Sequence, residues 1–407
     1  MMLWQIFVSF LRLGCTSFGG PIAHIGFFRS EFVLNKGWLS ERDYFDLVTL
    51  CQFLPGPASS QVGMAIGLLR AGYAGALVAW LGFTLPSAIL MLALAAGYMQ
   101  FAALVPEQLL HGLKLAAVAI IAQAVYAMAK SYCTGPRTWV IAILSLLLLS
   151  LSASSYWQVL TIGCGALLGL LLVKPVPLTA ASEPAVFSQI SKSAGLGFGL
   201  LFMMLLLGLP IVATMLQQPL LNSIEAFFRA GSLVFGGGHA VLPMLQADFV
   251  SSGAVSADSF IAGYGAVQAV PGPLFTFAGF LGASIDPTTN AGTGIHGGLL
   301  GGWLGGVVGL IAIFTPAFLV LAAVLPFWQT LRATLWMQKA MAGIGASVVA
   351  ILLSTLYHPV ATSTLLSPLD IGLAMLALLA LQWQKINPWQ LVLLSAIGGG
   401  LCAVLLP

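Results

Sequence analysis

Long apolar segments, separated by short polar stretches, follow one another along almost the whole chain. Runs such as Leu196–Met215 reach ~20 residues, the length a helix needs to cross the ~30 Å hydrocarbon core of a bilayer. A transmembrane β-barrel would instead show weaker segments of alternating residues. Because lipid offers no partners for backbone N–H and C=O groups, each run has to form a helix. The pattern therefore predicts an all-α, polytopic helical membrane protein.

The composition of the chain supports this interpretation. Of its 407 residues, 59% are hydrophobic and 6% are charged, whereas a soluble domain carries roughly 25% charged residues. Most of the surface must then face a lipid bilayer. The net charge of +3 is too small and too dispersed to indicate a nucleic-acid partner, and we expect none.

No sequence motif of a metal or cofactor site is present, since the chain lacks Walker A, HExxH, GxSxG and dinucleotide-binding patterns. The five cysteines form no CxxC pair and lie in or beside apolar stretches. This placement indicates small buried hydrophobic side chains. We therefore expect no metal, no cofactor and no enzymatic activity.

One polar, proline-containing stretch divides the chain. We interpret residues 174–193 as a cytoplasmic linker, because they combine prolines and polar residues between apolar segments. The linker follows a first half, residues 1–173. An extra helix at residues 194–216 and a second half, residues 217–407, come after it.

The two halves resemble each other in sequence. FLRLGCTSFGGPIAHI around Arg12 matches FFRAGSLVFGGGHAVL around Arg229 at a constant offset of 217. Further along, Pro55-Gly56-Pro57 matches Pro271-Gly272-Pro273 at an offset of 216, and FTLP in the first half resembles IFTP in the second. Successive matches at nearly the same offset indicate an internal duplication.

We expect the second copy to have the opposite orientation in the membrane. An odd number of apolar segments precedes it when the extra helix is counted. With a cytoplasmic N terminus, most Lys and Arg residues fall on cytoplasmic loops, as the positive-inside rule requires. The exceptions are Arg29, Lys36 and Arg42, which we place in an outside loop. Broken segments that re-enter the membrane would lower the number of full crossings.

Two kinds of interruption occur in both halves. One is the glycine-rich break, Phe18-Gly19-Gly20-Pro21 and Phe235-Gly236-Gly237-Gly238, and the other is the PGP tripeptide. Proline removes a backbone donor and glycine loosens the helix, so such segments persist in a membrane only where they line a cavity or are buried in protein. Paired interruptions at matching positions are the best sequence indicator of a transporter's binding site. The predicted substrate site therefore contains Gly19, Gly20, Pro21, Pro55, Gly56, Pro57, Gly236, Gly237, Pro271, Gly272 and Pro273.

Polar residues accompany both PGP motifs. A helix that restarts after PGP presents free N–H groups and the positive end of its dipole, which suit an anion. Ser59, Ser60 and Thr276 follow the motifs and are candidate hydrogen-bond donors. Gln52 and Gln268 each lie three residues before a motif and are further candidates. The alternative is that PGP is a simple kink and that the hydroxyls bond to carbonyl groups of their own helices.

An arginine precedes each glycine-rich break. Arg12 and Arg229 lie inside apolar segments, where a charged side chain normally faces a cavity or a partner, so both are candidates for substrate binding. Two alternatives remain open. Arg12 is close enough to the N terminus for its side chain to reach the interface, and Arg229 has Glu225 four residues earlier as an ion-pair partner.

Proton coupling has three candidate residues. Asp46 precedes the first PGP motif, and His24 and His239 lie just after the two glycine-rich breaks. The alternative interpretation is an ordinary helix-end charge for Asp46 and satisfied interior histidines for the other two.

Together these segments resemble a known family, the chromate ion transporters of the long-chain type with two fused homologous halves. The resemblance is carried by FLRLGCTSFGGPIAHIG, GWLSERDYFDLVTLCQFLPGPASSQVGMAIG, VFGGGHAVLPML and VQAVPGPLFTFAGFLG, and it covers nearly the whole chain. It implies export of chromate, a tetrahedral dianion close to sulfate in shape, across a bacterial inner membrane. It also implies two halves of opposite orientation. The second break lacks the proline of the first, so the halves are not expected to be equivalent at the site.

The sequence therefore predicts a secondary active transporter that exports chromate, or a related tetrahedral oxyanion such as sulfate, by alternating access. Two alternatives stay open, an anion channel and an intramembrane enzyme acting on lipid or protein. Whether the protein forms a homodimer is also open.

Overall fold

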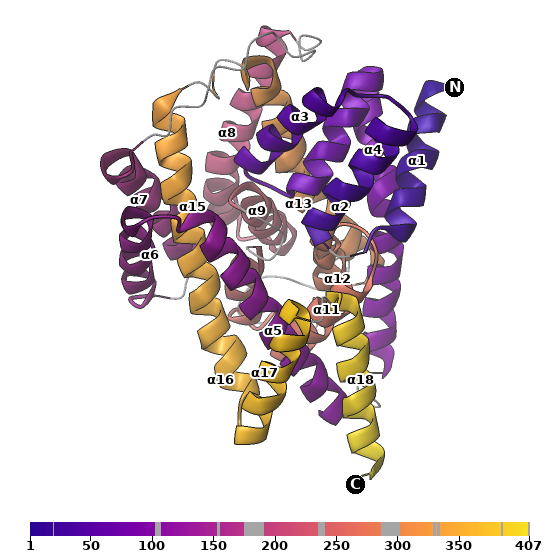
Figure 1. Ribbon diagram of the computed structural model, residues 1–407, viewed down its shortest axis with the longest axis vertical. Helices are drawn as coiled ribbons and strands as arrows, with labels where there is room; N and C mark the ends of the chain where they lie inside the picture. The colour runs from indigo at the N-terminus through magenta and orange to yellow at the C-terminus, as the bar shows by residue number, and fades with distance from the viewer. Residues whose placement is uncertain are drawn as a thin grey trace.

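The chain forms a bundle of helices in the computed structural model, which describes residues 1–18, 20–101, 107–152, 155–174, 191–234, 241–285, 302–328, 331, 334–383 and 386–405 (Figure 1). Over these ranges there is no strand, which confirms the all-α prediction. Five helices are long and apolar enough to cross a membrane, namely Ala58–Tyr98, Leu110–Tyr132, Lys192–Leu216, Trp303–Phe327 and Leu335–His358.

The first half begins with short helices and continues with long ones. Ser40 caps the third α-helix of this half, and its hydroxyl accepts a hydrogen bond from the Asp43 N–H. The elements are α1 (Met2–Thr16), α2 (Gly20–Arg29), the π-helical η1 (Ser30–Asn35), α3 (Glu41–Phe53), α4 (Ala58–Phe101), α5 (Glu107–Tyr132), α6 (Pro136–Leu149) and α7 (Ser155–Leu172). Helix α8 (Lys192–Leu216) follows the predicted linker, whose residues 175–190 lie outside the described residues.

The second half repeats this order. Ser256 caps α11 as Ser40 caps α3, with its hydroxyl accepting from the Ser259 N–H. The elements are α9 (Pro219–Ser232), α10 (Leu242–Leu245), η4 (Gln246–Val250), α11 (Ala257–Ala269), η5 (Leu274–Thr276), α12 (Phe277–Ala283), α13 (Trp303–Val324), η6 (Leu325–Phe327), α15 (Leu335–Thr355), η7 (Leu356–Ala361), α16 (Thr362–Thr364), α17 (Pro368–Trp383) and α18 (Pro388–Leu405).

In each half, the segments on either side of the glycine-rich break pack against each other. In the first half, the ring of Phe10 on α1 lies 4.7 Å from that of Phe32 on η1. In the second half, the equivalent rings of Phe227 on α9 and Phe249 on η4 are 4.5 Å apart. Aromatic pairs at these spacings pack favourably. The broken segments are therefore re-entrant helical hairpins, as the sequence allowed, and not continuous crossings.

Equivalent glycines let equivalent helices approach closely. A Cβ on Gly14 of α1 would lie 2.6 Å from the carbonyl oxygen of Phe83 on α4. A Cβ on Gly231 of α9 would collide in the same way with the carbonyl oxygen of Ile313 on α13. Small residues permit such contacts between helices in membranes. The two halves thus share this helix–helix contact as well as their sequence motifs.

The two halves are inverted relative to each other. In Figure 1, α3 lies in the upper part of the view, near the N terminus, whereas its counterpart α11 lies in the lower part, toward the C terminus. This confirms the predicted fold class, a helical membrane protein with an inverted repeat and re-entrant helices.

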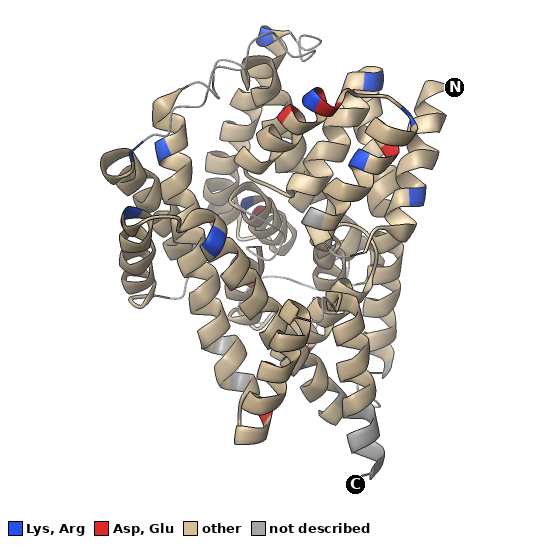
Figure 2. Ribbon diagram, viewed as in Figure 1, with Lys and Arg blue, Asp and Glu red and all other residues tan. Residues whose placement is uncertain are grey.

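The predicted separation of Arg29, Lys36 and Arg42 from the other basic residues is not observed. Lys36 and Arg70 lie over the same indole ring, that of Trp38, at 4.9 and 5.0 Å from its centre. Because α2 folds back along α1, this connection reaches the end of the molecule that also holds Arg70. Figure 2 shows most Lys and Arg residues toward this end. The basic residues therefore gather toward one end of the molecule more than the sequence count indicated.

Candidate functional site

The PGP motif of each half bonds to the interrupted segment of the other half. The Gly56 N–H donates to the carbonyl of Val234 at 2.7 Å, and the Gly272 N–H donates to the carbonyl of Ser17 at 3.0 Å. Gly56 and Gly272 occupy equivalent positions in the repeat, and so do Ser17 and Val234. These two reciprocal bonds define a central junction, where all four interrupted segments meet.

Glycine is required at the middle of both PGP motifs. Gly56 has φ +116° and Gly272 has φ +109°, conformations that side chains disfavour. A Cβ on Gly56 would also lie 3.3 Å from the Cβ of Ala317, and one on Gly272 would lie 2.7 Å from the Oγ of Ser87. The motifs thus allow a close contact between the halves that no other residue type would permit.

On the first-half side of the junction, a buried histidine organises polar groups. The His24 side chain is 1% exposed, and its Nε2 lies 3.2 Å from the Ser17 carbonyl while its Nδ1 lies 3.3 Å from the Ser59 hydroxyl. Since a carbonyl can only accept, Nε2 carries the proton, and Nδ1 of the neutral ring accepts from Ser59. The Ser17 carbonyl thus accepts two hydrogen bonds, one from His24 Nε2–H and one from the Gly272 N–H of the other half.

Several polar atoms beside this histidine are buried without a hydrogen-bond partner. They are Oγ of Ser17, Oγ of Ser60, Oε1 of Gln61 and Oγ1 of Thr84, while Nε2 of Gln61 donates to the Pro55 carbonyl at 2.8 Å. An unsatisfied buried polar group costs about 1–3 kcal/mol. A polar ligand bound between these segments would satisfy such atoms.

The second half has lost this polar character. At the equivalent positions its side chains are apolar and buried, except that Thr276 takes the place of Ser60 and donates to the Pro273 carbonyl at 2.8 Å. The pairs are Ser17 and Val234, His24 and Val241, Ser59 and Phe275, Gln61 and Phe277, Thr84 and Phe314, and Ser87 and Ala317.

The two predicted arginines lie in different surroundings. Arg12 is exposed. Arg229 is 5% exposed, and its Nε donates to Glu225 at 2.6 Å while its Nη2 donates to both oxygens of Asp248 at 3.1 Å. The pairing with Glu225 is the alternative that the sequence left open.

The remaining predicted residues are placed as follows. Gly20 and Pro21 begin α2, and Pro55, Pro57, Pro271 and Pro273 flank the junction glycines. Gln52 is exposed, Asp46 is half-buried on α3, and Gln268 is half-buried with its Nε2 unpartnered. Four predicted residues lie outside the described residues, namely Gly19, Gly236, Gly237 and His239.

Sequence reasoning missed three polar residues of the junction, Ser17, Gln61 and Thr84. Ser17 directly precedes the first break, and Gln61 lies one turn after the first PGP motif, so proximity to the interruptions was an available signal. Thr84 had no such signal, because it reaches the junction only through the packing of α4 on α1.

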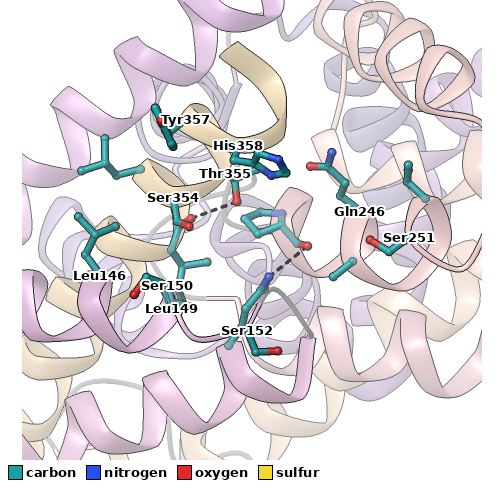
Figure 3. A pocket seen from close by; sticks show the side chains of 16 residues that line it. Leu146, Leu149, Ser150, Ser152, Gln246, Ser251, Ser354, Thr355, Tyr357 and His358 are labelled. Atoms are coloured by element: carbon teal, nitrogen blue, oxygen red, sulfur yellow. Dashed lines mark hydrogen bonds between the residues drawn. The ribbon is translucent and has the colours of Figure 1, made fainter. Parts of the chain in front are cut away.

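A second feature between the halves is a cavity of about 820 Å³ (Figure 3). Its walls come from α6 and α7 of the first half and from α10, η4, α15 and η7 of the second. Gln158 on α7 is 7% exposed there, with its Oε1 unpartnered. In Figure 3 the His358 ring and the Gln246 amide point toward each other across the cavity.

Comparison with known proteins identifies the family. A model of the chromate transporter family matches residues 4–170 and 221–400, so each half is matched separately and together they make up most of the chain. The chain belongs to the chromate transporter family. It is accordingly an integral membrane protein of a transporter family.

Several relatives of this chromate transporter family member are named for chromate transport. A probable chromate transport protein of Synechococcus elongatus is 30% identical over 80% of this chain and 77% of its own length. The chromate transport protein of Pseudomonas aeruginosa is 27% identical over 98% of this chain and 92% of its own length. That of Cupriavidus metallidurans is 29% identical over 69% and 67%. No solved structure matches the chain.

Proposed function

We propose that this protein exports chromate, or a closely related tetrahedral oxyanion such as sulfate, as a secondary active transporter that works by alternating access in a bacterial inner membrane. The relatives named for chromate transport support the substrate class. The inverted repeat with re-entrant hairpins supports a binding site between the halves. We propose a transport role alone and no enzymatic activity.

One observation carries this proposal, the three buried hydroxyl groups without a partner on the first-half side of the central junction, those of Ser17, Ser60 and Thr84. The N terminus of α4 lies there, with Ser59 and Ser60 in its first turn and Ser17 nearby. A fully deprotonated tetrahedral oxyanion only accepts hydrogen bonds, so neutral hydroxyls and a helix N terminus can hold it. Because Arg229 is already engaged by two carboxylates, we assign the anion to neutral donors.

The reciprocal bonds of the junction suit alternating access. Each PGP glycine is tied to the opposite half, so a rocking motion that opens one side loosens one bond and leaves its counterpart in place. Because the halves are inverted, the same motion in reverse opens the other side.

The membrane potential is a sufficient driving force. The chain carries no ATP-binding motif. Moving a dianion out of a cell that is negative inside is favoured by roughly 4–5 kcal/mol per 100 mV.

Uptake of labelled chromate into inverted membrane vesicles tests the proposal. We expect saturable uptake, competition by sulfate, and counterflow of labelled chromate against unlabelled chromate loaded inside. Ser60→Ala should reduce uptake, because it removes a donor at the α4 N terminus. Linear uptake without counterflow would instead indicate the channel, and absence of any chromate or sulfate uptake would exclude the proposed substrate class.

A further inference from the structure

Helix α11 of the second half is docked on its neighbours along one face. Ile261, Gly265 and Gln268 lie four and three residues apart, so they share that face. Ile261 and Gly265 are buried and Gln268 is half-buried. A Cβ on Gly265 would lie 3.5 Å from the Cδ2 of Leu113 on α5, and α18 also contacts α11. The cover of this face therefore comes from α5 and α18.

The equivalent face of α3 in the first half is uncovered. Phe45, Thr49 and Gln52 stand where α11 has these three residues, and we call them the α3 face. Phe45 is 60% exposed, and Thr49 and Gln52 are exposed as well. Helix α3 packs on α2 and α4, but within the part of the chain that the structure describes no comparable packing joins it to α7 or α15. The repeat is thus asymmetric at this face.

Helix α15 is the counterpart of α5, because each is the next long helix after the segment that contains FTLP or IFTP. Both are held by helices of the opposite half. The hydroxyls of Ser145 on α6 and Ser347 on α15 lie 2.8 Å apart, and His111 Nε2 on α5 lies 2.7 Å from an oxygen of Asp370 on α17. Since α11 docks on α5, the repeat assigns α15 to the α3 face.

The start of α15 has the exposure that a free docking surface requires. Residues 335–342 include no buried residue, whereas α5 is buried without interruption over residues 115–121. Two residues recur with the same spacing, Lys114 and Ala117 in α5 and Lys339 and Ala342 in α15. This correspondence makes Gln338 the counterpart of Leu113. Two surfaces that are joined in one half of the repeat are therefore both open in the other.

The α3 face extends to the central junction. Gln52 at its end lies three residues before the first PGP motif and is exposed. Figure 1 shows α3 and α15 apart from each other in the upper part of the view, and most Lys and Arg residues in Figure 2 lie toward the same end. The junction is thus approached along the α3 face from the end that the proposed function places in the cytoplasm.

We propose that the α3 face docks on the start of α15 in a second state of the protein, in which α11 separates from α5. This exchange would close the α3 end and open the α11 end. The inference rests on the proposed function, because it names the surfaces that meet during alternating access. Docking would bury Phe45 while Ile261 becomes exposed, so the apolar surface gained at one end offsets that lost at the other. Both states can then be populated.

Disulfide cross-linking without any anion tests the exchange in a full-length variant whose five cysteines are replaced by alanine. Leu113→Cys with Gly265→Cys reports the docked α11. A Cβ on Gly265 would lie 3.8 Å from that of Leu113, a separation that suits a disulfide, so this pair should oxidise readily.

Two further pairs report the docked α3. Thr49→Cys is combined with Gln338→Cys, the position equivalent to Leu113, or with Met341→Cys almost one turn further along α15. We expect at least one of these pairs to form a disulfide. Thr49→Cys with Leu113→Cys is the matched control and should stay reduced, because α5 is the partner of α11. If both α3 pairs stay reduced while the α11 pair oxidises, the proposal is overturned.

A labelling experiment tests whether the two docking events exclude each other. Thr49→Cys is added to the variant with Leu113→Cys and Gly265→Cys, and its reaction with a soluble maleimide is followed before and after oxidation. The disulfide holds every molecule with α11 docked, so the α3 face should stay uncovered and Thr49→Cys should react faster. Thr49→Cys without the pair should react at the same rate before and after oxidation. An unchanged or slower reaction in the locked protein would contradict the exchange.

Uptake of labelled chromate and sulfate separates failure of this inference from failure of the proposed function. If the cysteine-free protein takes up neither anion, the proposed function is lost, and the cross-links still decide whether α3 docks on α15. If it transports chromate, oxidation of the Leu113→Cys and Gly265→Cys pair should abolish uptake and a reducing agent should restore it. Undiminished uptake by the locked protein would retain the function and remove this inference.

Discussion

The two halves of this protein have the same backbone plan and opposite chemistry at their centre. Around the junction, the first half buries neutral polar groups such as His24, Ser60 and Gln61, while the second half buries Val241 and Phe277 at corresponding positions. Beyond the glycine-rich break the relation reverses. The second half holds Glu225, Arg229 and Asp248, the charge cluster, with little exposure, whereas the first half has the exposed Val8 and Arg12 and the partly exposed Glu31 at the corresponding positions.

The difference shows how a duplicated protein divides its tasks. Features that hold the halves together are kept in both copies, including the PGP glycines and the paired rings Phe10–Phe32 and Phe227–Phe249. Under the proposed function, the groups assigned to bind the anion occur in one copy. We propose that the symmetric scaffold serves alternating access and that the asymmetric interior avoids two competing anion sites.

The largest expected effect comes from the charge cluster. Arg229→Gln leaves two buried carboxylates without their shared cation, which should destabilise the fold by ~3–5 kcal/mol. Arg12→Gln at the equivalent exposed position should change stability by well under half of that. Thermal unfolding of both variants in the same detergent checks the contrast, and equal shifts in Tm would contradict it.

The junction glycines should show a smaller and symmetric effect. Gly56→Ala and Gly272→Ala each force a side chain into a disfavoured conformation and against the opposite half, at a cost of about 1–3 kcal/mol plus the local clash. Gly26→Ala, where a Cβ would meet nothing within 4 Å, is the control. The unfolding midpoints of the three variants test this, and a strongly unequal loss for the two junction variants would refute the reciprocal contact.

Next in size is the contrast between Ser60 and Thr276. A hydrogen bond to a charged group contributes about 1.5–3 kcal/mol, so Ser60→Ala should reduce kcat/KM for chromate roughly ten- to a hundredfold. Thr276→Ala should have a distinctly smaller effect, because its hydroxyl already donates within its own half. Initial rates of labelled chromate uptake measure both, and a larger loss in Thr276→Ala would reverse the assignment of the two halves.

The smallest effect is expected at a pair that links the halves at the surface. Lys114 on α5 lies 2.5 Å from Asp258 on α11, but Asp258 is 54% exposed. Exposed pairs contribute at most about 1 kcal/mol. Lys114→Gln and Asp258→Asn should each shift the unfolding midpoint only slightly, and the double variant should add little. A loss comparable to that of Arg229→Gln would show that the interface depends on this pair.

The sequence predicted the helices, the duplication, its inversion and the positions of the interruptions, because apolar length, repeated motifs and glycine or proline placement are local signals. It missed the direction of the α2 connection, since a segment that returns and one that crosses have the same composition. It also missed Thr84, because only the packing of α4 brings this residue near Ser17. The engagement of Arg229 by Asp248 was also missed, because it depends on how the segments on either side of the break pack together.

Locating the anion tests the central assignment most directly. Crystals of the full-length protein grown with chromate would reveal chromium by its anomalous X-ray scattering. We predict a single peak on the first-half side of the junction, within hydrogen-bonding distance of Ser60 and in front of the α4 N terminus. A peak beside Thr276, or one held by Arg229 in place of its carboxylates, would contradict the account.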